Sequence, residues 1–398
     1  MIVSGEGKDS TGWQNPANFL LVVSFIVPVA FASWSALLNN FSVESARFNG
    51  SDIGILQSVR EIPGFLAFSA VFILLFIKEQ RFLLIALSML TLGVAITGFF
   101  PSFNGLLLTT LLMSTGFHYL ETLKQSLTLQ WINKDEAPEM LGKLISAGAL
   151  ASLLTYGCLW LMLDLMKLSY LWVYLITGGV AFVLTAVVAL AFPQFQARTV
   201  QNKKLMLRKR YWLYYALTFM SGARRQIFTV FAGFLMVEKF GYSASEITLL
   251  FLINYVFNFL FARQIGKTIG RVGERRALML EYGGLILVFV GYAIVENAHV
   301  AAGLYVVDHL FFALALAIKT YFQKIADPAD MASTAGVSFT INHIAAVIIP
   351  ATFGLVWMVS PAAVFYIGAA MAVISLVLSL NIPGVPAKGN EVRILRWN

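Results

Sequence analysis

The feature that most constrains the fold is a series of long apolar runs that together fill most of the chain. A helix rises about 1.5 Å per residue, so roughly 20 apolar residues cross a hydrocarbon core of about 30 Å. Twelve runs reach spanning length, at 17–38, 54–77, 82–100, 105–131, 141–163, 169–192, 212–237, 245–265, 277–295, 300–323, 332–358 and 361–381. The sequence therefore predicts an all-α membrane protein with twelve transmembrane helices.

Composition and charge agree with a membrane location. Charged residues make up 12% of the chain and hydrophobic residues 59%, whereas soluble domains carry about 25% charge. The net charge of +8 would suggest nucleic acid as a partner in a soluble protein. Here the basic residues lie in short connections, so the expected contact is the lipid bilayer, and nucleic-acid binding is not expected.

The distribution of basic residues predicts the orientation. Of 28 Lys and Arg residues, only Arg47, Lys167 and Lys239 fall in the connections that follow odd-numbered runs. The other connections, the helix ends beside them and the two tails hold 20, and the remaining five lie within the runs. Cytoplasmic segments are enriched in Lys and Arg, so both termini are predicted to be cytoplasmic. Residues 1–16 lack the features of a signal peptide, so the first run is expected to be retained.

The longest basic connection divides the chain into halves. We expect an N-terminal tail at 1–16, a six-helix bundle at 17–192, a basic linker at 193–211, a second bundle at 212–381 and a tail at 382–398. An internal repeat supports this division, because 118–148 and 309–336 share an order of features. Each segment has a His, an apolar helix with one Lys, an acidic loop with Pro, and then a Met before a helix of small residues.

The stretch GKTIGRVGERR at 266–276 is predicted to be a compact basic loop between two helices. Its pattern resembles the signature loop of the major facilitator superfamily, although Gly270 and Glu274 depart from that pattern. In the first half, 72–82 retains only Lys78 and Arg81. The resemblance implies two six-helix bundles with a substrate site near the membrane midplane, and a monomeric secondary transporter in a bacterial inner membrane. It also implies a conformational latch formed by Gly266, Arg271, Gly273, Arg275 and Arg276.

Several charged residues lie inside the apolar runs. Each costs at least about 2.5 kcal/mol near the bilayer centre, so each needs a partner, water or a function. Five cations face three acids, and this surplus of two positive charges favours a small anionic substrate. The predicted substrate-binding residues are Arg60, Lys124, Arg224, Arg225, Lys319, Asn254, Asn258 and Tyr119. The alternative is structural ion pairing of Arg60 or Lys124 with Glu121 and of Arg224 with Asp308.

Proton coupling requires a group that changes its protonation during the transport cycle. Carboxylates and imidazoles inside the apolar runs are the candidates, although an intramembrane His is also a common packing residue. The predicted proton-coupling residues are Glu61, Glu121, Asp308, His118, His309 and His343.

Motifs for enzymatic chemistry are absent from the sequence. It has no GxSxG motif, no P-loop and no His pair at metal-binding spacing, and its one cysteine, Cys158, lies in an apolar run. We therefore expect no enzyme activity, no cofactor and no metal site. The first hypothesis is a proton-coupled transporter of a small organic anion that works by alternating access. The alternatives are a proton-driven exporter of amphipathic drugs or lipids, and a membrane receptor or accessory subunit that moves no substrate.

Overall fold

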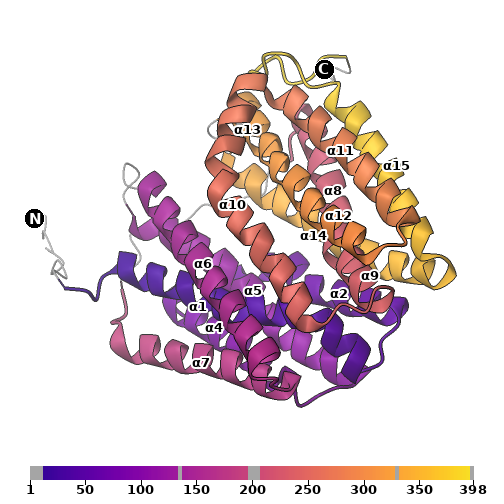
Figure 1. The fold of residues 1–398 in the computed structure, drawn as a ribbon. Coiled ribbons are helices and arrows are strands. Elements are labelled where there is room, and N and C mark those ends of the chain that lie inside the picture. The colour runs from indigo at the N-terminus through magenta and orange to yellow at the C-terminus, as the bar shows by residue number, and fades with distance from the viewer. Residues whose placement is uncertain (1–11, 133–136, 196–206, 328–330, 395–398) are drawn as a thin grey trace, which may run out of the picture.

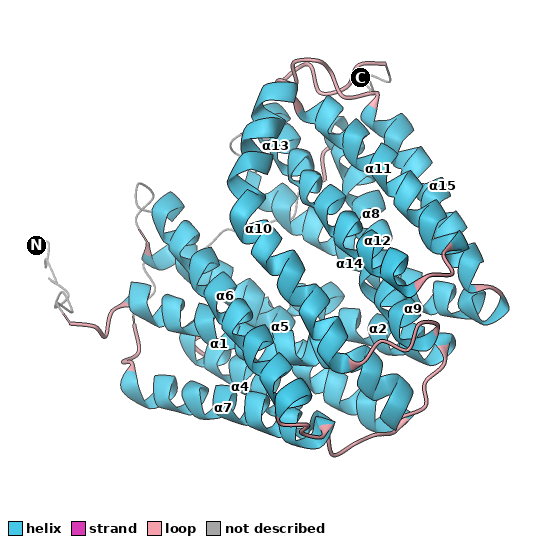
Figure 2. Cartoon of the chain, in the orientation of Figure 1, coloured by secondary structure: helices cyan, strands magenta, loops and turns pink. Residues whose placement is uncertain are grey.

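The computed structural model describes residues 12–132, 137–195, 207–327 and 331–394. Within these residues the protein is built from helices and connecting loops (Figure 2). Each of the twelve predicted apolar runs coincides with helical structure. Eight helical segments are individually long and apolar enough to cross a membrane. The protein is therefore an all-helical membrane protein.

The first half of the chain begins with a helix capped by Asn15, whose side chain accepts from the Asn18 amide. Its helices are α1 (Pro16–Asn40), α2 (Gly50–Phe65), α3 (Ala70–Ile73), α4 (Glu79–Thr97), α5 (Phe103–Trp131), α6 (Ala137–Trp160) and α7 (Tyr170–Ala191). Short 3₁₀ or π segments join or extend them: η1 (Phe41–Ser45), η2 (Leu66–Ser69) and η3 (Leu161–Leu165).

The second half repeats this helical arrangement. Its helices are α8 (Trp212–Gln226), α9 (Gly233–Glu238), α10 (Ala244–Val272), α11 (Glu274–Ile294), α12 (Ala298–Phe312), α13 (Leu316–Ile325), α14 (Met331–Val359) and α15 (Pro361–Ser379). The short segments are η4 (Lys209–Tyr211), η5 (Ile227–Ala232) and η6 (Ala313–Ala315).

Three predicted spans are interrupted rather than continuous. The run at 54–77 overlaps α2, η2 and α3. The run at 212–237 overlaps α8, η5 and α9, and the run at 300–323 overlaps α12, η6 and α13. η5 is a π-helical segment, in which the backbone hydrogen bonds skip one additional residue. The segment begins at Ile227, two residues after Arg225, and it changes the direction of the side chains along the rest of the span.

The predicted loop at 266–276 is wrong in its local structure. Residues 266–272 form the last turns of α10, and α11 begins at Glu274, so Gly273 alone joins the two helices. Gly273 has φ +83° and ψ 156°, a conformation that is essentially restricted to glycine. Lys and Arg are good helix formers, so α10 continues beyond its apolar part.

Figure 1 shows the helices of the first half on one side and those of the second half on the other. α2 packs closely along α14, and α6 packs against α10. The contact is closest between the beginning of α2 and the end of α14, where the backbone of Gly54 meets that of Pro350 and Gly354. In Figure 1, α6 and α10 diverge toward the beginning of α6 and the end of α10.

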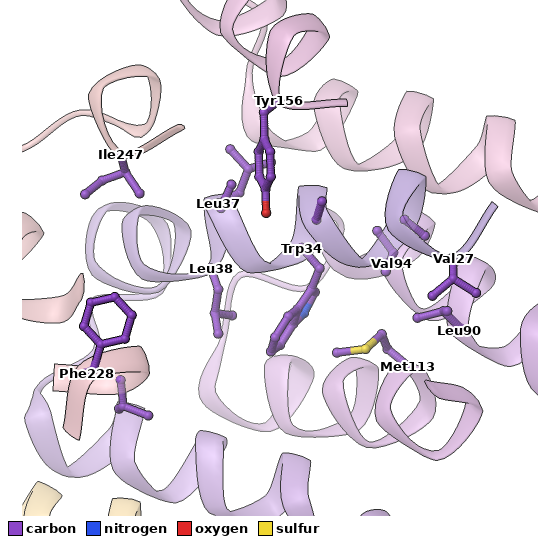
Figure 3. Close-up of a cluster of buried hydrophobic side chains, with 14 of the residues drawn as sticks. Val27, Trp34, Leu37, Leu38, Leu90, Val94, Met113, Tyr156, Phe228 and Ile247 are labelled. Atoms are coloured by element: carbon purple, nitrogen blue, oxygen red, sulfur yellow. The ribbon is translucent and has the colours of Figure 1, made fainter. Parts of the chain in front are cut away.

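The core continues from one half to the other. α1 packs against α4, α6 and α7, and also contacts α9 and α10 of the second half. Figure 3 shows Trp34, Leu37 and Leu38 of α1 among buried side chains that include Phe228 and Ile247. A mutual core of this kind brings polar residues of the two halves together between α2, α5, α8 and α14.

The described part of the segment after α15, predicted as a tail, packs onto the second half. Tyr321 donates to the Glu391 carbonyl at 2.6 Å, and Lys388 pairs with Asp327 at 2.7 Å. Val392 is buried in a small core beside the ends of α8, α11 and α13. The described part of this segment is therefore ordered by contacts rather than free in solvent.

Candidate substrate and proton site

Glu61 of α2 lies at the centre of the polar cluster between the two halves. Its side chain is buried, and one carboxylate oxygen, Oε1, accepts a hydrogen bond from Arg60 Nε at 3.0 Å and a second contact from the same guanidinium. The Arg60 guanidinium carbon lies 5.8 Å from the centre of the Trp34 ring. Arg60 keeps a side-chain exposure of 16%, so it remains accessible beside a buried partner.

The other carboxylate oxygen of Glu61 faces two histidines from different halves. His118 of α5 places Nε2 at 3.8 Å from Oε2, and His343 of α14 places Nε2 at 3.6 Å from the same oxygen. The two rings lie edge to face with centroids 5.1 Å apart. Gly64, one helical turn after Glu61, permits this arrangement, because a Cβ at that position would overlap both imidazoles.

Both imidazoles are fixed by hydrogen bonds at their other ring nitrogen. His118 Nδ1 lies 3.0 Å from the Ser114 carbonyl oxygen, and His343 Nδ1 lies 2.8 Å from the Phe339 carbonyl oxygen. A carbonyl oxygen can only accept a hydrogen bond. Ser114 Oγ also lies 3.0 Å from His118 Nδ1, but it donates its own proton to the Arg60 carbonyl oxygen, so the ring proton is assigned to Nδ1 in both histidines. The neutral form of each ring therefore presents its Nε2 lone pair to Glu61.

Arg224 and Arg225 are adjacent in sequence but lie in different environments. Arg225 donates to Asn342 Oδ1 of α14 at 3.5 Å, beside His343, and is close enough to attract Glu61. Arg224 is buried within the second half. It pairs with Glu281 of α11 at 3.5 Å and lies 4.4 Å from the centre of the Tyr282 ring. Arg225 is thus the arginine that belongs to the cluster around Glu61.

Asp308 belongs to the buried cluster of Arg224. Its side chain is fully buried, and neither of its carboxylate oxygens has a hydrogen-bond partner among the described residues. Arg224 and Glu281 interact electrostatically with Asp308, as do the side chains of Tyr292 and Tyr305. This places Asp308 within one half rather than at the junction of the two.

The predicted ion pairs are partly those observed. Lys124 pairs with Glu121 at 2.5 Å, as one of the alternatives proposed. Arg60 pairs with Glu61 rather than Glu121, and Arg224 pairs with Glu281 rather than Asp308. Glu281 was missed in the sequence, although it stands inside the run at 277–295. Including it reduces the surplus of positive charge from two to one.

The other predicted residues lie away from Glu61. Tyr119 shares a 2.6 Å hydrogen bond with Ser69, and Lys319 is exposed on α13. Asn254 is buried in α10, where its Oδ1 has no partner among the described residues, whereas the side chain of Asn258 lies outside them. His309 lies with its ring centroid 6.1 Å from that of Phe228.

The residues predicted to form a latch surround the junction of α10 and α11. Arg271 and Arg276 are exposed, and Gly266 and Arg275 are partly exposed. The buried group at this junction is Glu274, which pairs with Lys324 at the end of α13 at 2.6 Å. An acid at the first position of α11 also interacts favourably with the helix dipole.

Comparison with known proteins identifies the wider group. Residues 24–350 match the model of the Major Facilitator Superfamily. No curated protein matches the sequence. The fold is similar to that of a mutant of the nucleoside transporter NupG, with a TM-score of 0.76 and 16% identity over 92% of this chain and 99% of that one.

Two further solved structures share the fold. A POT family transporter in complex with 5-aminolevulinic acid gives a TM-score of 0.71 at 12% identity, over 92% of this chain and 94% of that one. A bacterial homologue of the human lysosomal transporter Spinster, in an inward-facing and unoccupied conformation, gives 0.67 at 13% identity, over 92% and 95%. At these identities the similarity concerns the fold.

Proposed function

The chain belongs to the major facilitator superfamily of secondary transporters, and from this premise we propose that it moves a small organic anion by alternating access, coupled to protons. The observation that carries the proposal is the position of Arg60 and Arg225. They come from different halves of the chain, and both lie beside the single carboxylate of Glu61. Arginine from each half can grip an anion as the halves rearrange around it.

Glu61 provides a physical route to coupling. A substrate carboxylate or phosphate that binds Arg60 and Arg225 competes with the Glu61 carboxylate for the same cations. Once its ion pair is lost, Glu61 is a buried charge, and protonation removes the cost of that charge. His118 and His343 lie beside the freed carboxylate and can donate or accept that proton.

The proposed topology has both termini and the 193–211 linker in the cytoplasm, with bundles at 17–192 and 212–381. The close contact between α2 and α14 then lies toward the outer side of the membrane. In this arrangement the substrate site would communicate with the cytoplasm in the conformation described here. The C-terminal segment would pack onto the cytoplasmic ends of the second bundle.

The transport test uses purified protein in liposomes with an imposed pH gradient. The panel contains carboxylates, organic phosphates and cationic drugs. It also contains nucleosides and 5-aminolevulinic acid, because structurally similar proteins are a nucleoside transporter and a transporter in complex with 5-aminolevulinic acid. We expect gradient-driven flux of an anion. Drug flux would instead support the exporter, and anion binding without any flux would support a receptor.

The matched variants are Arg225→Gln and Lys267→Gln. Each removes one positive charge, but Arg225 lies in the cluster and Lys267 is exposed on α10. Losing a charge-assisted contact costs about 1.5–3 kcal/mol, so Arg225→Gln should weaken apparent affinity by roughly tenfold or more. Equal flux and affinity in both variants would refute the role of Arg225 in anion binding.

A further inference from the structure

The side chains of Glu61, His118 and His343 form a cluster whose geometry has a second implication. Within the described residues, these three side chains each offer a ligand atom, and those atoms all lie within 4.8 Å of one another. They come from α2, α5 and α14, so they are far apart in the sequence. The expectation of no metal site depended on local spacing of His residues, which does not detect such a cluster.

The orientation of the two imidazoles is that of metal ligands. Each ring donates Nδ1–H to a backbone carbonyl of its own helix, His118 to Ser114 and His343 to Phe339. This hydrogen bond is the usual support of a metal-binding histidine, because it fixes the ring and leaves Nε2 as the ligand atom. Both Nε2 atoms then converge on Glu61 Oε2.

The three ligand atoms repel one another when both imidazoles are neutral. Two Nε2 lone pairs face a carboxylate oxygen at 3.6 and 3.8 Å, and three acceptors do not attract one another. A cation between them resolves the repulsion. One proton can serve only one pair of these atoms, whereas a metal ion at about 2.0–2.2 Å from each ligand serves all three.

We propose that Glu61, His118 and His343 form a binding site for a divalent transition metal ion such as Zn²⁺ or Co²⁺, shared between the two halves of the protein. Tetrahedral ligands at about 2.05 Å from a metal lie roughly 3.3 Å apart. The two Nε2 atoms, at 3.6 and 3.8 Å from Oε2, would therefore each move closer to it by about 0.3–0.5 Å, and no pair of ligand atoms, all within 4.8 Å, would close by more than about 1.5 Å. Imidazole and carboxylate ligands suit zinc and cobalt rather than calcium or magnesium. The fourth position remains for water or an anion.

The surrounding charges set the expected strength of binding. Arg60 pairs with Glu61 Oε1 and leaves Oε2 for the metal. Arg60 and Arg225 are nevertheless positive and close, so they oppose a dication. Arg225→Gln should therefore tighten metal binding, the opposite of its expected effect on anion affinity. The two measurements separate the metal site from the proposed transport function.

The experiment is a titration of the full-length, detergent-solubilised protein with Co²⁺ after removal of any affinity tag. We expect one equivalent of Co²⁺ to produce the intense visible absorption of a four-coordinate site, and Zn²⁺ to displace it. The protein has four histidines, and the control variant His299→Ala/His309→Ala removes the two outside the cluster. This control should bind as the native protein does.

The variants that test the ligands are His118→Ala, His343→Ala and Glu61→Gln, each checked for folding by thermal unfolding. Each should abolish the absorption band. Gly64→Ala keeps every ligand but pushes the imidazoles away from α2, and we expect it to weaken Co²⁺ binding about 10–100-fold. Unchanged one-equivalent binding in folded His118→Ala/His343→Ala protein, or binding lost only in the control, would overturn the proposal.

Zn²⁺ should also stabilise the conformation described here, because its ligands come from both halves. A ligand that binds only the folded state raises stability by about 2.7 kcal/mol at a concentration of 100 times its dissociation constant. We expect Zn²⁺ to raise the unfolding temperature of the native protein and of His299→Ala/His309→Ala. An equal rise in His343→Ala would contradict a shared site. This readout requires no transport substrate.

Discussion

At the scale of single residues, the adjacent pair Arg224 and Arg225 has two separate roles. Arg224 is buried with Glu281 and the ring of Tyr282, whereas Arg225 contacts Asn342 at the junction of the halves. Adjacent residues on a helix point about 100° apart, and the π-helical segment that follows adjusts the direction of the rest of the span. Substituting these two residues should therefore give different defects.

We predict that Arg224→Gln destabilises the protein by about 3–5 kcal/mol, because it leaves a buried Glu281 without its cation. The double variant Arg224→Gln/Glu281→Gln should recover most of that loss, and Arg225→Gln should unfold near the native temperature. Thermal unfolding in detergent measures all three. If Arg224→Gln is as stable as the native protein, the buried pair is not structural.

The sequence identified the charged residues inside the membrane spans more successfully than it identified their ion-pair partners. Glu61, Arg60, Arg225, His118 and His343 were all identified as charges or imidazoles inside apolar runs. Their convergence depends on the packing of α2, α5, α8 and α14, which no local pattern encodes. Glu281 was detectable by the same criterion, because it is an acid in a spanning run, and its omission produced the wrong partner for Arg224.

At the scale of elements, the apolar runs predicted the positions of the helices because hydrophobicity and length dominate in a membrane. They did not predict the interruptions at η2, η5 and η6, which depend on contacts between helices. They also made the junction of α10 and α11 too long, since Gly and charged residues suggested a loop. The structure instead places the whole change of direction at Gly273.

We predict that Gly273→Ala lowers stability by about 1–3 kcal/mol, because a side chain is strained at φ +83° and ψ 156°. The matched control is Gly270→Ala, three residues earlier within α10, where an added Cβ meets nothing within 4 Å. Alanine favours a helix over glycine, so Gly270→Ala should be neutral or slightly stabilising. Thermal unfolding distinguishes them, and equal behaviour of the two variants would refute the strain argument.

At the scale of the whole molecule, the junction of α2 with α14 holds the two halves together at one end. The Ala351 amide donates to Ser58 Oγ across this junction at 2.9 Å. Gly54 and Gly354 allow the helix backbones to touch. A transporter that works by alternating access must separate these helices at another stage of its cycle.

We predict that cysteines at Ser58 and Ala351, in a Cys158→Ser background, cross-link upon oxidation or with a short bifunctional thiol reagent. Cross-linking should stop transport, and reduction should restore it. Adding Gly54→Leu, which fills the contact, should lower the cross-linking yield, whereas Gly179→Leu on α7 faces open space and should not. Full transport by cross-linked protein would show that α2 and α14 stay together throughout the cycle.

The glycine contact between α2 and α14 has a consequence for the proton gradient across the membrane. Where the Gly54 backbone touches Gly354 and Pro350, no water-filled path can run between the two helices. Protons move through membranes along connected water molecules, so this contact blocks protons as well as holding the two halves together. A bulkier residue at Gly54 would separate the helices. Protons would then leak across the membrane and dissipate the electrochemical gradient, even in a cell that has no substrate to carry.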